Sequence, residues 1–123
     1  MQRNNWRGVE RTMRGSGKIH TFTDEDIAEY KKAWSQSGAM NAMINWYRAA
    51  VRYLPKTLKE GQVKVPMLML WGMKDAVLSH RMARPSLDYC DDWKLVFFED
   101  ATHWVQHDEA EGVNQLLVEF LSR

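Results

Sequence analysis

Two short apolar runs without polar alternation place the strongest constraint on how this chain can fold. Residues 65–71 read Val-Pro-Met-Leu-Met-Leu-Trp, and residues 95–98 read Leu-Val-Phe-Phe. Such runs are typical of parallel strands whose two faces are both covered by helices. The segment between them, residues 79–89, is predicted to be helical, with an interruption or restart at Pro85. Strand, helix and strand of these lengths predict a right-handed crossover unit.

The part of the chain before these strands is predicted to be mainly helical. Residues 1–22 are polar and lack a clear period, so we predict a loop with at most a short helical turn. Thr23 is predicted to cap a helix that begins with three acids and runs toward Gly38. A second helix is predicted from about Ala39 to Leu54, ended by Pro55, with apolar and aromatic side chains on one side: Met40, Met43, Ile44, Tyr47 and Val51.

The chain is predicted to divide into a helical segment, residues 1–55, and an α/β segment, residues 56–123, that begins with a charged connector over 56–64. The α/β segment ends in a helix that Asp108 is predicted to cap, with Glu111 three residues later completing a capping box. Its apolar stripe consists of Val113, Leu116, Leu117, Phe120 and Leu121. Strands with this apolar pattern require neighbours in a sheet, so the sequence predicts that partner strands lie outside the chain.

Composition excludes several classes of protein. The 17 basic residues are matched by 16 acidic ones, which argues against a nucleic-acid-binding surface. Cys90 is the only cysteine, so the chain has no intrachain disulfide and no multi-cysteine zinc site, as is typical of a reducing compartment. The N-terminus is too polar for a signal peptide, and every apolar run is shorter than the roughly 20 residues of a membrane span. We therefore expect a soluble, cytoplasmic chain.

An acid and a histidine each follow one of the predicted strands. Asp75 closes Trp-Gly-Met-Lys-Asp after the first strand, and His103 lies in Ala-Thr-His-Trp after the second. Both strands of a parallel pair end at the same edge of the sheet, which is where ligands bind in open α/β sheets. There a carboxylate can accept the imidazole N–H, select its tautomer and stabilise the imidazolium. The sequence thus predicts a catalytic Asp75–His103 pair.

No metal ion or cofactor is predicted. His107 lies four residues after His103, a spacing that metal-binding helices use, but the nearby sequence offers too few further ligands for zinc.

Three segments resemble the epoxide hydrolase branch of the α/β-hydrolase fold: Asn45-Trp46-Tyr47-Arg48-Ala49, Leu70-Trp71-Gly72-Met73-Lys74-Asp75 and Thr102-His103-Trp104-Val105-Gln106. The second occurs in many α/β-hydrolases, whereas the first and third together are more specific. The resemblance extends from about Thr21 to the end of the chain. It implies the C-terminal part of such a fold: two parallel strands with a crossover helix and a C-terminal helix, preceded by a helical cap.

The resemblance also implies a reaction. In that family an aspartate opens an epoxide to form an alkyl-enzyme ester, and water activated by a His/Asp pair hydrolyses the ester to a vicinal diol. Asp75 and His103 match the pair, and Tyr47 matches a cap tyrosine that donates to the epoxide oxygen. A phenol of pKa about 10 remains protonated at neutral pH and can donate in this way. Trp104 and Val77, with Leu78, resemble pocket-lining positions, and each fits an ordinary packing role as well.

The family's nucleophilic aspartate, its His-Gly-x-Pro segment and a second cap tyrosine are absent, and would precede Met1. The chain alone is therefore expected to be inactive. Two alternatives remain: a haloalkane or haloacid dehalogenase of the same fold, and a truncated binding module without activity. The segment around Tyr47 favours epoxides, since halide binding prefers Trp and His donors. The expected partners are a small epoxide, a missing N-terminal half or a second copy of the chain.

Overall fold

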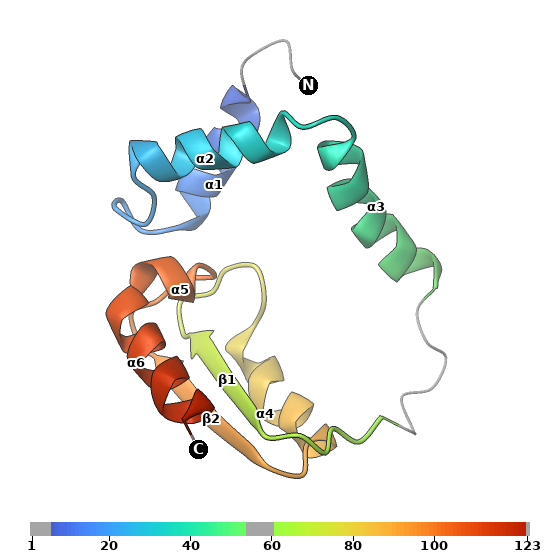
Figure 1. The fold of residues 1–123 in the computed structure, drawn as a ribbon, viewed down its shortest axis with the longest axis vertical. Coiled ribbons are helices and arrows are strands. Elements are labelled where there is room, and N and C mark those ends of the chain that lie inside the picture. Colours follow the sequence, from blue (N-terminus) through green and yellow to red (C-terminus); the bar gives the residue numbers. More distant parts are fainter. Residues whose placement is uncertain (1–5, 54–60, 123) are drawn as a thin grey trace.

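The structure of the chain, a computed structural model, describes residues 6–53 and 61–122. Within them, a two-stranded sheet is formed by β1 (Met67–Gly72) and β2 (Trp93–Phe98). The strands are parallel and pair from Met67 opposite Trp93 to Gly72 opposite Phe98. The predicted parallel pair is confirmed, and both strands end at the same edge (Figure 1).

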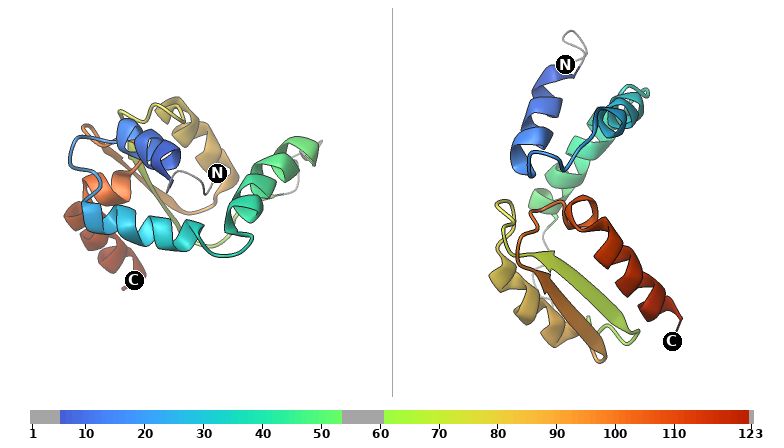
Figure 2. Two further views of the ribbon diagram at one scale, coloured as in Figure 1. Left: turned by 90° about the horizontal axis from the view of Figure 1, so that it is seen from above. Right: turned by 90° about the vertical axis from the view of Figure 1, so that its left-hand side faces the viewer.

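Helical segments lie on the two faces of this sheet. The connection from β1 to β2 runs through η2 (His80–Met82), α4 (Ala83–Ser86) and η3 (Leu87–Tyr89). The predicted crossover helix thus forms over nearly its whole extent, but as three short pieces. Pro85 lies within α4 and has no N–H to donate, which disfavours one regular helix here. Figure 2 shows α4 on one face of the sheet and α6 (Ala110–Leu121) on the other.

Residues 7–16 are helical, so the prediction of a loop with at most a short helical turn was wrong there, while residues 17–22 contain no helix and residues 1–5 lie outside the described residues. α1 spans Arg7–Ser16. Its buried or half-buried apolar residues, Val9 and Met13, are four residues apart and lie on the side of the helix that packs against its neighbour. So few apolar residues among so many polar ones give a weak periodic signal. The helix is stabilised by tertiary packing rather than by its own sequence.

α2 (Asp24–Trp34) begins as predicted. The Thr23 hydroxyl accepts from the Asp26 N–H at 3.1 Å, and Asp26 Oδ2 accepts from the Thr23 N–H at 2.9 Å, which completes a capping box. α1 and α2 lie beyond the carboxyl ends of the strands (Figures 1 and 2). They share a largely aromatic core, against which Trp104 of the α/β segment also packs: Trp6, Met13, Phe22, Ile27 and Trp34.

α3 (Ala39–Arg52) forms where the second helix was predicted. It contains no buried residue, and the side chains of its predicted apolar side are mostly exposed, with Tyr47 73% and Val51 78% accessible. The predicted end of this helix at Leu54, the boundary between residues 55 and 56, and most of the charged connector lie outside the described residues.

The predicted cap of the last helix was wrong. The N-cap position of α6 is Glu109, and Asp108 ends the preceding short helix α5 (Val105–Asp108). Asp108 instead lies within α5 and accepts hydrogen bonds from Thr102 and Thr21, so these donors occupy its carboxylate oxygens in place of the first N–H groups of α6. The apolar stripe is present in part: Val113 is buried, while Leu117 and Leu121 are exposed.

Of the helices within residues 6–53 and 61–122, none combines the length and apolar character that crossing a bilayer requires. In the same part of the chain, no three His, Cys, Asp or Glu side chains are grouped so that they could hold a metal ion.

Candidate active site

The two residues predicted to form a catalytic pair meet at the carboxyl edge of the sheet. Nδ1 of His103 lies 2.9 Å from Oδ2 of Asp75, although 28 residues separate them in sequence. The Asp75 side chain is only 7% exposed, whereas that of His103 is 34% exposed. The pair therefore has a buried acid and an imidazole that solvent can reach.

Asp75 is held in place by its own backbone turn. Its Oδ1 accepts from the N–H groups of Val77, at 2.8 Å, and Leu78, at 2.9 Å, which leaves Oδ2 for His103. Burial works to raise the pKa of Asp75, but these hydrogen bonds and the nearby imidazole outweigh it and hold the pKa below its ordinary value. Asp75 is thus an ionised acceptor at neutral pH, and Nδ1 of His103 must be the donor.

This protonation pattern decides what the pair can do. With its proton on Nδ1, a neutral His103 has a free electron pair on Nε2 and can accept a proton from water or a hydroxyl group. The imidazolium that results is stabilised by the adjacent carboxylate. Asp75 and His103 therefore have the geometry that a general base and its orienting acid require, and their catalytic role remains a prediction.

Gly72 allows the two loops to approach closely enough for this contact. A Cβ at this position would lie 2.2 Å from the carbonyl oxygen of Thr102 and 2.5 Å from that of Ala101. The loops are joined by backbone hydrogen bonds from Met73 N–H to Phe98 O and from Lys74 N–H to Ala101 O, both 2.9 Å long. Glycine at the end of β1 is therefore a steric requirement of the site.

Curated proteins similar to this chain are named as α/β-hydrolases and epoxide hydrolases. The AB hydrolase superfamily protein YfhM of Bacillus subtilis is 37% identical over 121 residues, which cover 98% of this chain and 42% of that protein. Epoxide hydrolase 2 of Caenorhabditis elegans is 34% identical over 99% of this chain and 36% of its own length. Human epoxide hydrolase 4 is 38% identical over 81% of this chain and 27% of its own length.

The chain is a relative of the epoxide hydrolase branch of the α/β-hydrolases.

Solved structures show the same fold. The chain superposes over its full length on 46% of a Bacillus megaterium epoxide hydrolase in complex with an inhibitor, with a TM-score of 0.82 and 22% identity. It also matches Cfl2 of Burkholderia cenocepacia, with a TM-score of 0.73, over 94% of this chain and 42% of that one. The predicted fold, the C-terminal part of an α/β-hydrolase, is confirmed. No protein-family model matches the chain. The chain spans less than half the length of these curated relatives and solved structures.

Two predicted pocket-lining residues lie next to the pair but differ in their contacts. Trp104 packs edge-to-face against Phe22 with ring centroids 4.9 Å apart, and its indole Nε1 donates to Ser16 Oγ at 2.9 Å. It also lies edge-to-face against the His103 ring, at 5.5 Å. Val77 is 59% exposed and contributes its backbone N–H to Asp75. A pocket-lining role for either residue remains a prediction.

Tyr47 lies apart from the pair. It is exposed on α3 and lines an open cavity of about 610 Å³ together with Arg48, Val51 and Arg52. Within residues 6–53 and 61–122, no hydrogen bond joins Tyr47 to Asp75 or His103. Its role as a hydrogen-bond donor to an epoxide oxygen remains a prediction.

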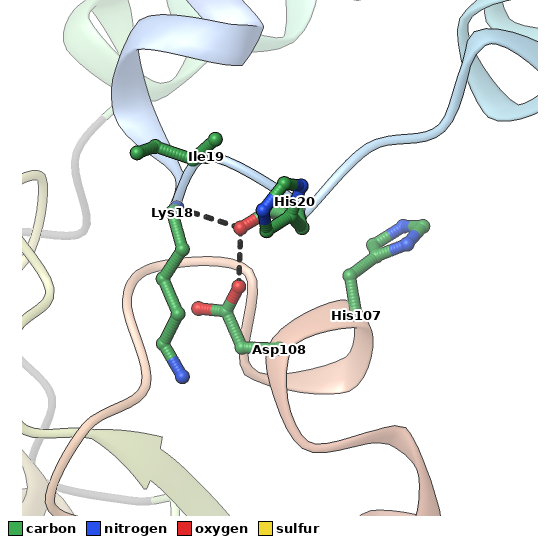
Figure 3. A pocket seen from close by; sticks show the side chains of 6 residues that line it. Lys18, Ile19, His20, His107 and Asp108 are labelled. Carbon is green, nitrogen blue, oxygen red and sulfur yellow. Dashed lines mark hydrogen bonds between the residues drawn. The ribbon is translucent and has the colours of Figure 1, made fainter.

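Sequence reasoning missed the polar contacts that join the α1–α2 hairpin to the His103 loop. Asp108, expected as a helix cap, instead faces the segment Lys18–Thr21 (Figure 3). Lys18 Nζ pairs with Glu109 Oε1 at 3.0 Å, and the Tyr30 hydroxyl lies 3.1 Å from His107 Nε2. Residues about 80 to 90 positions apart in sequence form these contacts, and no local pattern indicates them.

Proposed function

We propose that this chain supplies the general base, its orienting acid and a cap tyrosine of an epoxide hydrolase. The observation that carries the proposal is the Asp75–His103 pair, with 2.9 Å between Oδ2 and Nδ1, at the carboxyl edge of an α/β-hydrolase sheet. The names of its curated relatives favour epoxides as substrates. The nucleophilic aspartate of this chemistry would come from outside the 123 residues.

The proposed reaction has two covalent steps. A carboxylate oxygen of the nucleophilic aspartate attacks an epoxide carbon, the C–O bond breaks, and the ring oxygen takes a proton from the Tyr47 hydroxyl as the ester forms. His103 Nε2 then removes a proton from water while the hydroxide attacks the ester carbonyl. The ester C–O bond breaks, the leaving alkoxide takes the remaining proton of the attacking hydroxide, and the diol leaves while the aspartate returns as a carboxylate. The proton on His103 then passes through water to the Tyr47 phenolate, which restores both side chains to their starting state.

The division of the chain also forms part of the proposal. Residues 1–55 act as the cap, with α1 and α2 packed around their own core, and residues 56–123 act as part of the hydrolase core. The α1–α2 hairpin lies over the strand ends that present Asp75 and His103 (Figure 1). A helical layer in this place would restrict the access of water to the ester.

The exposed surfaces support pairing with a further segment. No residue of β1 or β2 except Gly72 is fully buried, and Phe97 is 39% exposed. Among the described residues, the indole Nε1 of Trp71 is buried without a hydrogen-bond partner. An unsatisfied buried donor costs about 1–3 kcal/mol, which a neighbouring acceptor would remove. Both features fit strands that pair with the N-terminal half of an α/β-hydrolase.

The test combines this chain with the part of the Bacillus subtilis relative that lies outside the 121-residue match, which the proposal takes to be its N-terminal part. We expect the mixture to hydrolyse styrene oxide, and each part alone to be inactive. His103→Ala should stop turnover but still permit alkylation, so mass spectrometry should detect the ester on the N-terminal part. Tyr47→Phe should slow ester formation.

Controls separate the competing functions. His80 is half-buried against Phe97 and takes no part in the hydrogen bonds of the pair, so His80→Ala should leave turnover unchanged. Fluoroacetate as substrate tests dehalogenase activity, and a preference for it over styrene oxide would refute the epoxide assignment. Size-exclusion chromatography shows whether the two parts associate. If they associate but neither turnover nor ester formation is detected, a binding module without catalysis is favoured.

A further inference from the structure

The segment Lys18–Thr21 is held against the helix that follows His103. Thr21 is 6% exposed, and its hydroxyl donates to Oδ1 of Asp108 while accepting the Lys18 N–H at 2.6 Å. Figure 3 marks both hydrogen bonds with dashed lines: one lies within the Lys18–Thr21 segment, and the other joins this segment to Asp108. The ion pair between Lys18 and Glu109, at 3.0 Å, lies beside them. The α1–α2 hairpin is thus joined to the α/β segment through Asp108.

The second oxygen of Asp108 holds the loop that carries His103. Oδ2 accepts from the Thr102 N–H at 2.7 Å and from the Thr102 hydroxyl at 2.6 Å. The same hydroxyl accepts the Trp104 N–H at 3.3 Å. The residues on both sides of His103 are therefore bound, directly or through Thr102, to the carboxylate of Asp108.

The arrangement requires an ionised carboxylate. Three donors reach its two oxygens, and none of its contacts needs it to donate. Burial works to raise the pKa of Asp108, but the hydrogen bonds from Thr102 and Thr21 and the charge of Lys18 hold it below its ordinary value. An asparagine amide in its place would point its NH₂ group either at the Thr21 hydroxyl or at the two Thr102 donors, and the hydrogen bonds on that side would be lost.

We infer that Asp108 is a positioning residue that couples docking of the Lys18–Thr21 segment to the orientation of His103. This inference rests on the proposed function, because it gives the orientation of His103 a catalytic purpose. Asp108 touches neither member of the pair and acts through Thr102. When Thr21 loses its hydrogen bond to Asp108, the His103 loop loses one of the constraints on its geometry, although Thr21 lies 103 − 21 = 82 residues away in sequence.

Thr21→Val tests the inference, since it removes the hydroxyl and keeps the shape of the side chain. In the 123-residue chain, NMR should show the His103 Nδ1 proton exchanging faster with solvent and the Thr102 amide losing protection. In the complemented enzyme, kcat should fall by about three- to tenfold with little change in KM. Thr21→Ser keeps the hydroxyl and should restore both signals. Thr12→Val removes an exposed hydroxyl that bonds only within α1, and should change neither.

A double variant tests whether the effect passes through Asp108. Asp108→Asn should produce changes of the same kind, and adding Thr21→Val to it should cause little further loss, because the two residues act through one contact. Full additivity, or an unchanged Nδ1 proton in a folded Thr21→Val chain, would overturn the inference. The NMR arms require no turnover, so a failure of the proposed hydrolase activity in the complemented wild type is recognised separately.

Discussion

Gly72→Ala is the substitution whose effect follows most directly from the geometry of the site. The added Cβ would lie 2.2 Å from the Thr102 carbonyl oxygen, whereas an ordinary contact begins near 3.4 Å, so the loop must move by about 3.4 − 2.2 = 1.2 Å. The atoms in the way belong to the backbone and cannot rotate aside. The displacement would strain the hydrogen bonds from Met73 to Phe98 and from Lys74 to Ala101.

The cost combines two terms. Overpacking costs about 1–3 kcal/mol, and weakening the two hydrogen bonds adds about 1 kcal/mol. We therefore expect the free energy of unfolding to fall by about 2–4 kcal/mol. Urea unfolding of the 123-residue chain, followed by tryptophan fluorescence, should show a midpoint lower by about 1 M or more, given the usual slopes for small proteins.

Gly15→Ala is the matched control. Gly15 lies in α1, and a Cβ there would meet nothing within 4 Å, so alanine should be neutral or stabilise the helix by up to about 1 kcal/mol. If Gly72→Ala and Gly15→Ala unfold at the same urea concentration as the parent chain, the close approach of the two loops is not a requirement of the fold. The reasoning about Gly72 would then be refuted.

Three further predictions concern the cap, the acids and the contact between the two segments. Thr23→Ala should destabilise the chain by about 1 kcal/mol in thermal unfolding, because it removes the cap of α2, whereas Thr23→Ser should retain most of that stability. The pKa values of Asp75 and Asp108 are lowered in the folded chain, so both carboxylates stabilise the fold fully above the ordinary pKa of 3.8, and this stabilisation is lost as the pH falls below 3.8. A circular dichroism titration should therefore show acid unfolding below pH 3.8, and the unfolding of Asp108→Asn should depend less steeply on pH. Trp104→Phe and Ser16→Ala each remove the hydrogen bond between α1 and the His103 loop and should each cost about 1 kcal/mol in urea unfolding, and the double variant should cost less than their sum.

Elements with strong local signals could be predicted from the sequence. The two uninterrupted apolar runs indicated β1 and β2, and Thr23 with the acids after it indicated the start of α2. The helical spacing of Met40, Met43 and Tyr47 indicated α3. In each case the signal lies within a few neighbouring residues, and this local sequence is enough to predict the strand or helix.

Other elements depended on residues far away in sequence. α1 was missed because its few apolar side chains become stabilising only when they pack against α2. Asp108 was assigned to a helix cap because Glu111 follows at the right spacing, yet the donors that it binds include Thr21, 87 residues earlier. The exposure of Tyr47 also could not be predicted, since helical periodicity shows which residues share a face and not whether that face is covered.

The sequence by itself determined the parallel strands and the placement of an acid and a histidine after them, because strand pattern and chain order are local properties. It also determined the resemblance to epoxide hydrolases that the relatives bear out. Only the tertiary structure decided that Asp75 would be anchored by two N–H groups, that Gly72 must lack a side chain and that Asp108 joins two segments. These features arise where distant parts of the chain meet, and their energies depend on distances of a few ångströms that no local pattern encodes.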